Sequence, residues 1–118
     1  MHILIVEDDL DTREILSELL QMQGHVIVTA SEAQHALDIL RQPSAIDLLI
    51  TDVSLPGMSG IELAKMSKAI QPSIGIMVCS GYGEQHCEAL PFPVEWSQKP
   101  LEMDAFLAAI ERFSGTRQ

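Results

Sequence analysis

The stretch SAIDLLITDVSLPGMSG, residues 44–60, places a single carboxylate, Asp52, at the end of an apolar run. An acid in this position is either a turn-forming residue or a reactive group. A second apolar run, HILIV, is also followed directly by acids: Glu7, Asp8 and Asp9. Carboxylates that lie close together repel each other, and a hard divalent cation such as Mg²⁺ relieves that repulsion through oxygen ligands. These residue types therefore predict a cation site if the fold brings the two runs side by side.

The elements that must position these acids alternate between two hydrophobic periods. Short apolar or β-branched runs predict strands, and apolar residues three and four apart predict helices. The predicted strands are 2–6, 25–30, 47–51, 74–79 and 94–97. The predicted helices are 10–24, 31–42, a segment from Ser59 that ends before Pro72, and a final one around Phe106. Strands that alternate with helices and are apolar nearly throughout form a parallel sheet that is covered on both faces.

The predicted helices carry local signals for their ends and for their buried faces. Asp9 is expected to cap the first helix, which leaves it outside the cation site, and Ser31–Gln34 and Ser59–Glu62 have the spacing of capping boxes. Apolar residues at helical spacing mark the faces that we expect to be buried. In chain order these are Ile15, Leu16, Leu19 and Leu20; Ala33, Ala36, Leu37 and Leu40; Leu63, Met66 and Ile70; and Met103, Phe106, Leu107 and Ile110.

The predicted fold is a flavodoxin-like, doubly wound α/β domain with a five-stranded parallel sheet. Five strands connected in this way most often take the order 2-1-3-4-5. The segment 81–94 is the exception to the regular alternation, because Pro91 and Pro93 exclude a long helix there. We therefore expect the fourth helix to be shortened or irregular.

Right-handed crossovers place the carboxyl ends of all the strands at one edge of such a sheet. In this order the first strand lies beside the third, so Glu7, Asp8 and Asp52 are expected to converge. Ser80 follows the fourth strand and Lys99 follows the fifth. We expect Ser80 to add a hydroxyl beside Asp52, and Lys99 to add a positive charge to the acidic edge.

Composition narrows the class of protein. The chain has 118 residues, the size of one domain, and a net charge of −10 that repels the phosphates of nucleic acids. No apolar run approaches the roughly 20 residues of a membrane span, and acids follow the first apolar run where a secretory signal would continue. We expect a cytoplasmic domain without direct nucleic-acid or membrane binding. The two cysteines, Cys79 and Cys87, are expected to be free thiols, with Cys79 buried in a strand.

Four segments together resemble the receiver domain of two-component response regulators, and the resemblance covers essentially the whole chain, 1–118. They are ILIVEDD (3–9), DLLITDVSLPGMSG (47–60), MVCSG (77–81) and QKP (98–100). The resemblance implies Mg²⁺-dependent acceptance of a phosphoryl group from a histidine kinase or a histidine phosphotransfer protein. Such a domain is no enzyme in the usual sense, although it assists its own phosphorylation and dephosphorylation. A downstream protein or output domain is implied but not identified.

The resemblance also assigns roles to individual residues. Asp52 matches the phosphoacceptor, and Glu7 and Asp8 match the acidic pair that holds Mg²⁺, with the backbone carbonyl of Ser54 as a further metal ligand. Ser80 matches the switch hydroxyl, and Lys99 matches the lysine that contacts the phosphoryl oxygens. Trp96 matches the switch aromatic. Taken singly, each of these residues also has a purely structural explanation, and this explanation weighs most for Trp96, since aromatic residues are most often part of a core.

Three other classes compete with this interpretation. A haloacid-dehalogenase-type phosphatase would need a second acid two residues after the nucleophile, where this chain has Ser54. A flavodoxin-like nucleotide or flavin binder would need a phosphate loop after the first strand, where this chain has three acids. A degenerate receiver that acts only as a protein-interaction module remains the alternative. Such a receiver has lost residues needed for phosphorylation, whereas this chain has all of them.

Overall fold

The structure is a computed structural model of the chain and describes residues 1–43, 45–80, 91–98 and 102–116. Its strands form one parallel sheet in the order β2-β1-β3-β4-β5, which confirms the predicted topology. The strands are β1 (His2–Val6), β2 (Val26–Ala30), β3 (Leu48–Asp52), β4 (Gly75–Ser80) and β5 (Glu95–Gln98). The helices of the described residues are α1 (Leu10–Met22), α2 (Ala33–Leu40), α3 (Gly60–Ile70) and α4 (Met103–Thr116).

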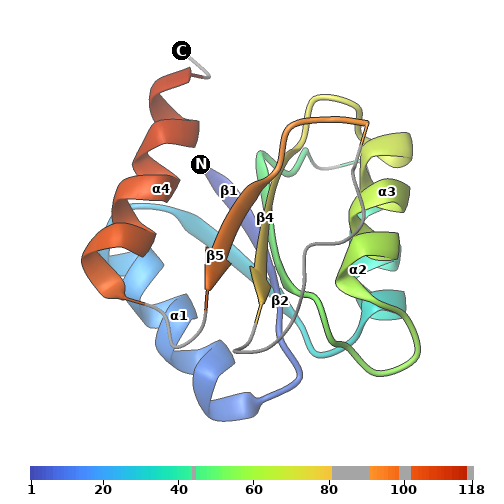
Figure 1. Cartoon of the computed structure of the whole chain (residues 1–118), viewed down its shortest axis with the longest axis horizontal. Helices are drawn as coiled ribbons and strands as arrows, with labels where there is room; N and C mark the ends of the chain where they lie inside the picture. The colour runs from blue at the N-terminus through green and yellow to red at the C-terminus, as the bar shows by residue number, and fades with distance from the viewer. Residues whose placement is uncertain (44, 81–90, 99–101, 117–118) are drawn as a thin grey trace.

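Two hydrophobic layers cover the sheet, with α1 and α4 on one face and α2 and α3 on the other (Figure 1). Successive side chains of a strand point to opposite faces, so each strand contributes to both layers. In β1, Leu4 and Val6 pack with α2 and α3, whereas Ile3 and Ile5 pack with α1 and α4. All of β3 is buried. Burial on both faces explains why the central strands are apolar nearly throughout.

Helix α1 begins at the predicted cap but buries a narrower face than expected. The Asp9 carboxylate accepts hydrogen bonds from the Thr12 N–H at 2.9 Å and from the Thr12 hydroxyl at 2.6 Å, which confirms the cap. Leu16 and Leu20 are buried, but Ile15 is 60 % exposed. The prediction for Ile15 was wrong because it lies at the edge of the apolar stripe, where the curved helix surface turns away from the sheet.

Helix α2 shows one correction. The residues predicted to be buried are all buried: Ala33, Ala36, Leu37 and Leu40. The predicted capping box at Ser31 is wrong, because the helix begins one residue later, with Glu32 at the N-cap and no side-chain capping bond.

Helix α3 has its predicted cap and a different buried face. The Ser59 hydroxyl accepts a hydrogen bond from the Glu62 N–H at 3.1 Å. Met66, predicted to be inward, is 36 % exposed, and the neighbouring Ser67 is buried instead. Ser67 tolerates burial because its hydroxyl donates to the Leu63 carbonyl at 2.7 Å.

The last elements agree with the sequence in part. In α4, Phe106 and Ile110 are buried as predicted, whereas Met103 is 38 % exposed, because it is the first residue of the helix and no helical turn precedes it. Cys79 is buried in β4, as expected. The predicted short helix and Cys87 lie within 81–90, outside the described residues. Among the described residues, no helix is long and apolar enough to cross a membrane.

Candidate functional site

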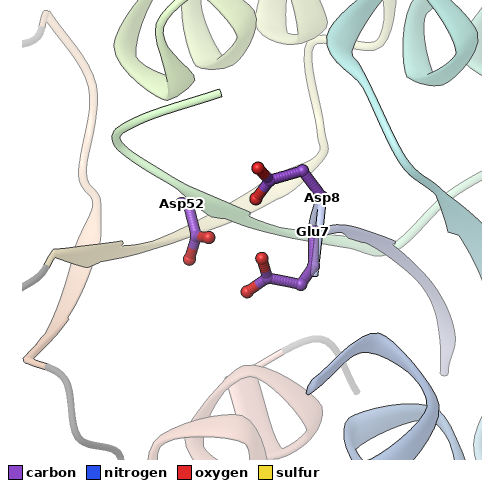
Figure 2. Close-up of side chains that lie close together, drawn as sticks. All are labelled: Glu7, Asp8 and Asp52. Carbon is purple, nitrogen blue, oxygen red and sulfur yellow. The ribbon is translucent and has the colours of Figure 1, made fainter. Parts of the chain in front are cut away.

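Glu7, Asp8 and Asp52 form a cluster at the carboxyl edge of the sheet. One carboxylate oxygen from each lies within 4.8 Å of the others, and Figure 2 shows the three side chains directed into a common space between β1 and β3. Glu7 is 4 % exposed and Asp52 8 % exposed, while Asp8 is exposed. The predicted convergence is therefore confirmed for these three residues.

The turn between β1 and α1 holds the first two acids. The Glu7 N–H donates to the Ala30 carbonyl of β2 at 3.1 Å, which continues the strand pairing to the end of β1. The Glu7 carboxylate accepts the Asp9 N–H at 3.1 Å, and the Glu7 carbonyl accepts a hydrogen bond from Arg13 Nη1 at 2.8 Å. The Asp9 carboxylate caps α1 through Thr12, so it points toward the helix and away from the other two acids, and this cap helps to fix the backbone of the turn.

The end of β3 fixes Asp52. Its Cα lies opposite Cys79 of β4, and the next residue, Val53, donates its N–H to the Cys79 carbonyl at 3.0 Å. The Val53 carbonyl in turn accepts the N–H of Gly60, the first residue of α3, at 2.7 Å. Asp52 therefore belongs to the sheet and not to the loop that follows it, and this placement limits the movement of its carboxylate.

The other predicted site residues lie around this cluster. Ser80 is the last residue of β4, one position beyond the partner of Asp52, and is 2 % exposed. Trp96 lies opposite Val78 in β5, is half-buried and packs against the layer formed with α2 and α3, so it is not part of the acid cluster. Ser54 is exposed in the loop after β3. Lys99 lies outside the described residues.

The cluster fits a hard divalent cation. Carboxylate oxygens are the ligands that Mg²⁺ and similar ions prefer, and ligands on opposite sides of a Mg²⁺ ion lie about 4 Å apart. Three oxygens that already lie within 4.8 Å of one another can therefore reach a single ion. Two of the three carboxylates are buried, and burial of like charges is unfavourable unless a cation compensates them. Glu7, Asp8 and Asp52 thus form a candidate metal site.

Two residues that position the site escaped the sequence analysis, namely Arg13 and Gly60. Arg13 acts on the backbone of Glu7 across the β1–α1 turn. Gly60 lies so close to the end of β3 that a Cβ there would overlap with the backbone carbonyl of Asp52. The sequence did contain a sign of this role for Gly60, because glycine directly follows the capping Ser59. Glycine destabilises a helix, so a glycine in the first turn suggests that a side chain would not fit there.

Comparison with known proteins identifies the family. The family model of the response regulator receiver domain matches residues 3–111. The chain is 34 % identical over 113 residues to the response regulator protein FleR of Pseudomonas aeruginosa, which covers 93 % of this chain and 24 % of FleR. It is 31 % identical over 115 residues to sporulation initiation phosphotransferase F of Bacillus subtilis, which covers 94 % of this chain and 91 % of that protein. Among solved structures, the BeF3-activated DrrB receiver domain superposes with a TM-score of 0.83 at 25 % identity, covering 97 % of each chain.

The chain therefore belongs to the response regulator receiver domain family. This is the class that acts in two-component signalling, where phosphorylation of an aspartate is typical, and the predicted family is confirmed. The chain spans about a quarter of the length of FleR and about nine-tenths of phosphotransferase F. Membership of this family sets aside the phosphatase and the flavin- or nucleotide-binding alternatives.

Proposed function

We propose that residues 1–118 form one receiver unit that accepts a phosphoryl group on Asp52 in the presence of Mg²⁺. The donor is the phosphohistidine of a histidine kinase or of a histidine phosphotransfer protein. The observation that carries this proposal is the cluster of Glu7, Asp8 and Asp52, in which a strand-anchored carboxylate stands beside two further acids. The resemblance to phosphotransferase F over nearly its whole length supports the same role.

In this reaction a carboxylate oxygen of Asp52 attacks the phosphorus atom. An oxygen–phosphorus bond forms, and the phosphorus–nitrogen bond of the donor breaks, with the electron pair leaving on the imidazole. Glu7 and Asp8 would hold Mg²⁺ together with Asp52 and the Ser54 carbonyl. When bound, Mg²⁺ neutralises charge on the phosphoryl oxygens. Asp52 keeps its orientation through the Val53–Cys79 backbone bond while it reacts.

Residues at the ends of the neighbouring strands would then contact the acyl phosphate. Lys99 is proposed to pair with a phosphoryl oxygen, and Ser80 to donate its hydroxyl to another as a charge-assisted hydrogen bond. Ser80 is the last residue of β4, beside the end of β3 that carries Asp52, and Trp96 lies on β5 two positions before the residue opposite Ser80. A movement of Ser80 would therefore reach the surface that Trp96 borders. Trp96 is the candidate aromatic switch, which responds to the space that Ser80 vacates.

The unit is proposed to work as a phosphoacceptor that promotes its own phosphorylation and dephosphorylation, and not as an enzyme that turns over a small substrate. We propose a cytoplasmic location, where the kinase domains of its donors act. The net charge of −10 disfavours direct contact with nucleic acid, so an output on DNA would need a further domain or partner.

Incubation with a small acyl-phosphate donor tests the proposal. We expect one phosphoryl group per chain when Mg²⁺ is present, and none when a chelator removes it, measured by intact-protein mass spectrometry. A chain that folds, binds Mg²⁺ and takes up no phosphoryl group would instead support the degenerate receiver, which acts through protein contacts alone.

A further inference from the structure

We propose that Arg13 is a positioning residue of the acidic site, which holds the peptide between Glu7 and Asp8 and thereby directs the Asp8 carboxylate toward Asp52. The inference rests on the proposed function, since it assigns a supporting residue to the same Mg²⁺ site. Its basis is one contact, in which Arg13 Nη1 donates to the Glu7 carbonyl oxygen at 2.8 Å.

This contact spans the turn that carries the acids. Arg13 lies in α1 and is half-buried, and its side chain returns from the helix to the last peptide before Asp8. A hydrogen bond to a charged donor is stronger than one between neutral groups, and a half-buried guanidinium exchanges it less readily for water. The peptide plane that Arg13 holds sets the direction in which the Asp8 Cα–Cβ bond leaves the backbone.

The orientation of the Asp8 carboxylate depends on the backbone more than the orientations of the Glu7 and Asp9 carboxylates do. The Glu7 carboxylate accepts the Asp9 N–H, and the Asp9 carboxylate is held by Thr12. The Asp8 carboxylate is exposed, and within the described part of the chain no hydrogen bond or ion pair holds it. Its place in the cluster with Glu7 and Asp52 therefore follows from the backbone, which Arg13 clamps.

The position of Arg13 in the helix points in the same direction. A cation near the N-terminus of a helix is disfavoured by the helix dipole, and Arg13 is the fourth residue after the Asp9 cap, with its N–H bonded to the Asp9 carbonyl. The nearby acids offset that cost.

The clamp and the charge make opposite predictions for metal affinity. Loss of a nearby positive charge strengthens binding of a cation, whereas loss of a clamp weakens it by leaving Asp8 free to turn away.

The sign of the change therefore tests the proposal. Arg13→Met keeps the aliphatic stem and removes the donor, and Arg13→Lys keeps one donor and the charge. The matched control is Arg41→Met, since Arg41 is an exposed arginine at the C-cap of α2 whose ion pair with Asp38, at 3.7 Å, is remote from the site. The measurements are Mg²⁺ affinity by calorimetry and hydrogen exchange of the Asp9 amide in metal-free protein, with thermal unfolding to establish that each variant is folded.

We expect Arg13→Met to weaken Mg²⁺ binding by about tenfold, the scale seen when a group that orients a metal ligand is removed. We also expect it to speed exchange of the Asp9 amide, which donates to the Glu7 carboxylate, Arg13→Lys to recover most of the affinity, and Arg41→Met to change neither. Wild-type or tighter Mg²⁺ binding in folded Arg13→Met would overturn the proposal. If Arg13→Met does not fold, Arg13→Gln decides, since it removes the charge and shortens the side chain so that the donor falls short of the Glu7 carbonyl: wild-type or tighter Mg²⁺ binding in that variant would contradict the clamp. Failure of the wild-type chain to bind Mg²⁺ would instead refute the proposed function.

Discussion

Gly60 and Asp52 are in direct backbone contact. The first residue of α3 packs on the peptide that follows the acid, and a Cβ at position 60 would lie 2.7 Å from the Asp52 carbonyl carbon and 3.1 Å from the Val53 Cα. The Gly60 N–H also donates to the Val53 carbonyl at 2.7 Å. The start of α3 is thus joined to the end of β3, and the loop between them closes beside the acid cluster.

Gly60→Ala should therefore damage both the fold and the site. The added methyl group overlaps with backbone, which cannot move as a side chain can, so we expect a loss of about 1–3 kcal/mol in the free energy of unfolding. We also expect weaker Mg²⁺ binding, because Asp52 is displaced. The control is Gly24→Ala, since Gly24 has a positive φ of 92° but open space around its Cα, far from the acids. It should cost about 1 kcal/mol through backbone strain and leave Mg²⁺ affinity unchanged. Full stability in Gly60→Ala, measured by chemical denaturation, would contradict the contact.

Asp8→Asn should have opposite effects on the two states of the site. Without metal, removal of one of three clustered charges relieves repulsion, and we expect a gain of about 0.5 kcal/mol in the free energy of unfolding, the scale of exposed charge pairs. With metal, the variant loses a ligand and binds Mg²⁺ more weakly. Denaturation with and without Mg²⁺ measures both effects. Unchanged Mg²⁺ affinity would remove Asp8 from the metal site.

Trp96 should report on phosphorylation. It is the only tryptophan of the chain, and it is half-buried opposite Val78, two residues before Ser80. We expect its fluorescence emission to change when beryllofluoride and Mg²⁺ mimic the phosphoryl group. Ser80→Ala should reduce the change, and Asp52→Asn should abolish it. If the mimic binds by an independent measurement and the emission stays constant, Trp96 is a packing residue and not a switch.

His25 should contribute to the pH dependence of stability. Burial lowers its pKa below the ordinary value of 6.5, the adjacent Met1 amine lowers it further, and Glu111 acts in the opposite direction. The amine lies 3.1 Å from His25 Nδ1. Because the unfolded chain then binds the proton more tightly than the folded one, stability falls as the pH drops below about 6.5 and levels off below the folded pKa.

His25→Gln should reduce this fall, since it removes the group whose pKa differs between the two states. The measurement is chemical denaturation at about pH 7.5 and pH 5.5, on either side of the unfolded pKa. The control is His35→Gln, which makes the same substitution at an exposed histidine of α2. An equal fall in His25→Gln and the wild type would exclude His25 as its source.

The sheet was predictable because burial on both faces leaves a direct trace in the sequence. The strands around Leu4, Leu49 and Val78 are apolar at successive positions, and the acids stand where those runs stop, so the order of the strands was enough to bring Glu7, Asp8 and Asp52 together. Helix faces were less predictable. Ile15 and Met66 fit the apolar period as well as Leu16 and Leu63 do, and periodicity does not show which edge of a stripe meets the sheet.

The supporting contacts were not predictable, because they join side chains to backbone. Ser67 is buried only because its hydroxyl reaches the Leu63 carbonyl, a bond that composition does not reveal. Arg13 reaches the Glu7 carbonyl across a turn whose conformation is set by Asp9. Such contacts depend on the path of the backbone, which the residue types alone leave open.

Phosphorylation of Asp52 is the central claim, and one comparison tests it most directly. Wild-type protein, Asp52→Asn and Asp47→Asn are incubated with a small acyl-phosphate donor and Mg²⁺, and their intact masses are recorded. Asp47 is the matched control, because it precedes the same strand at the opposite edge of the sheet, where its carboxylate accepts the His2 N–H at 2.8 Å. We predict that the wild type and Asp47→Asn gain the mass of one phosphoryl group and that Asp52→Asn gains none. Asp52→Asn labelled to the wild-type extent would contradict the assignment.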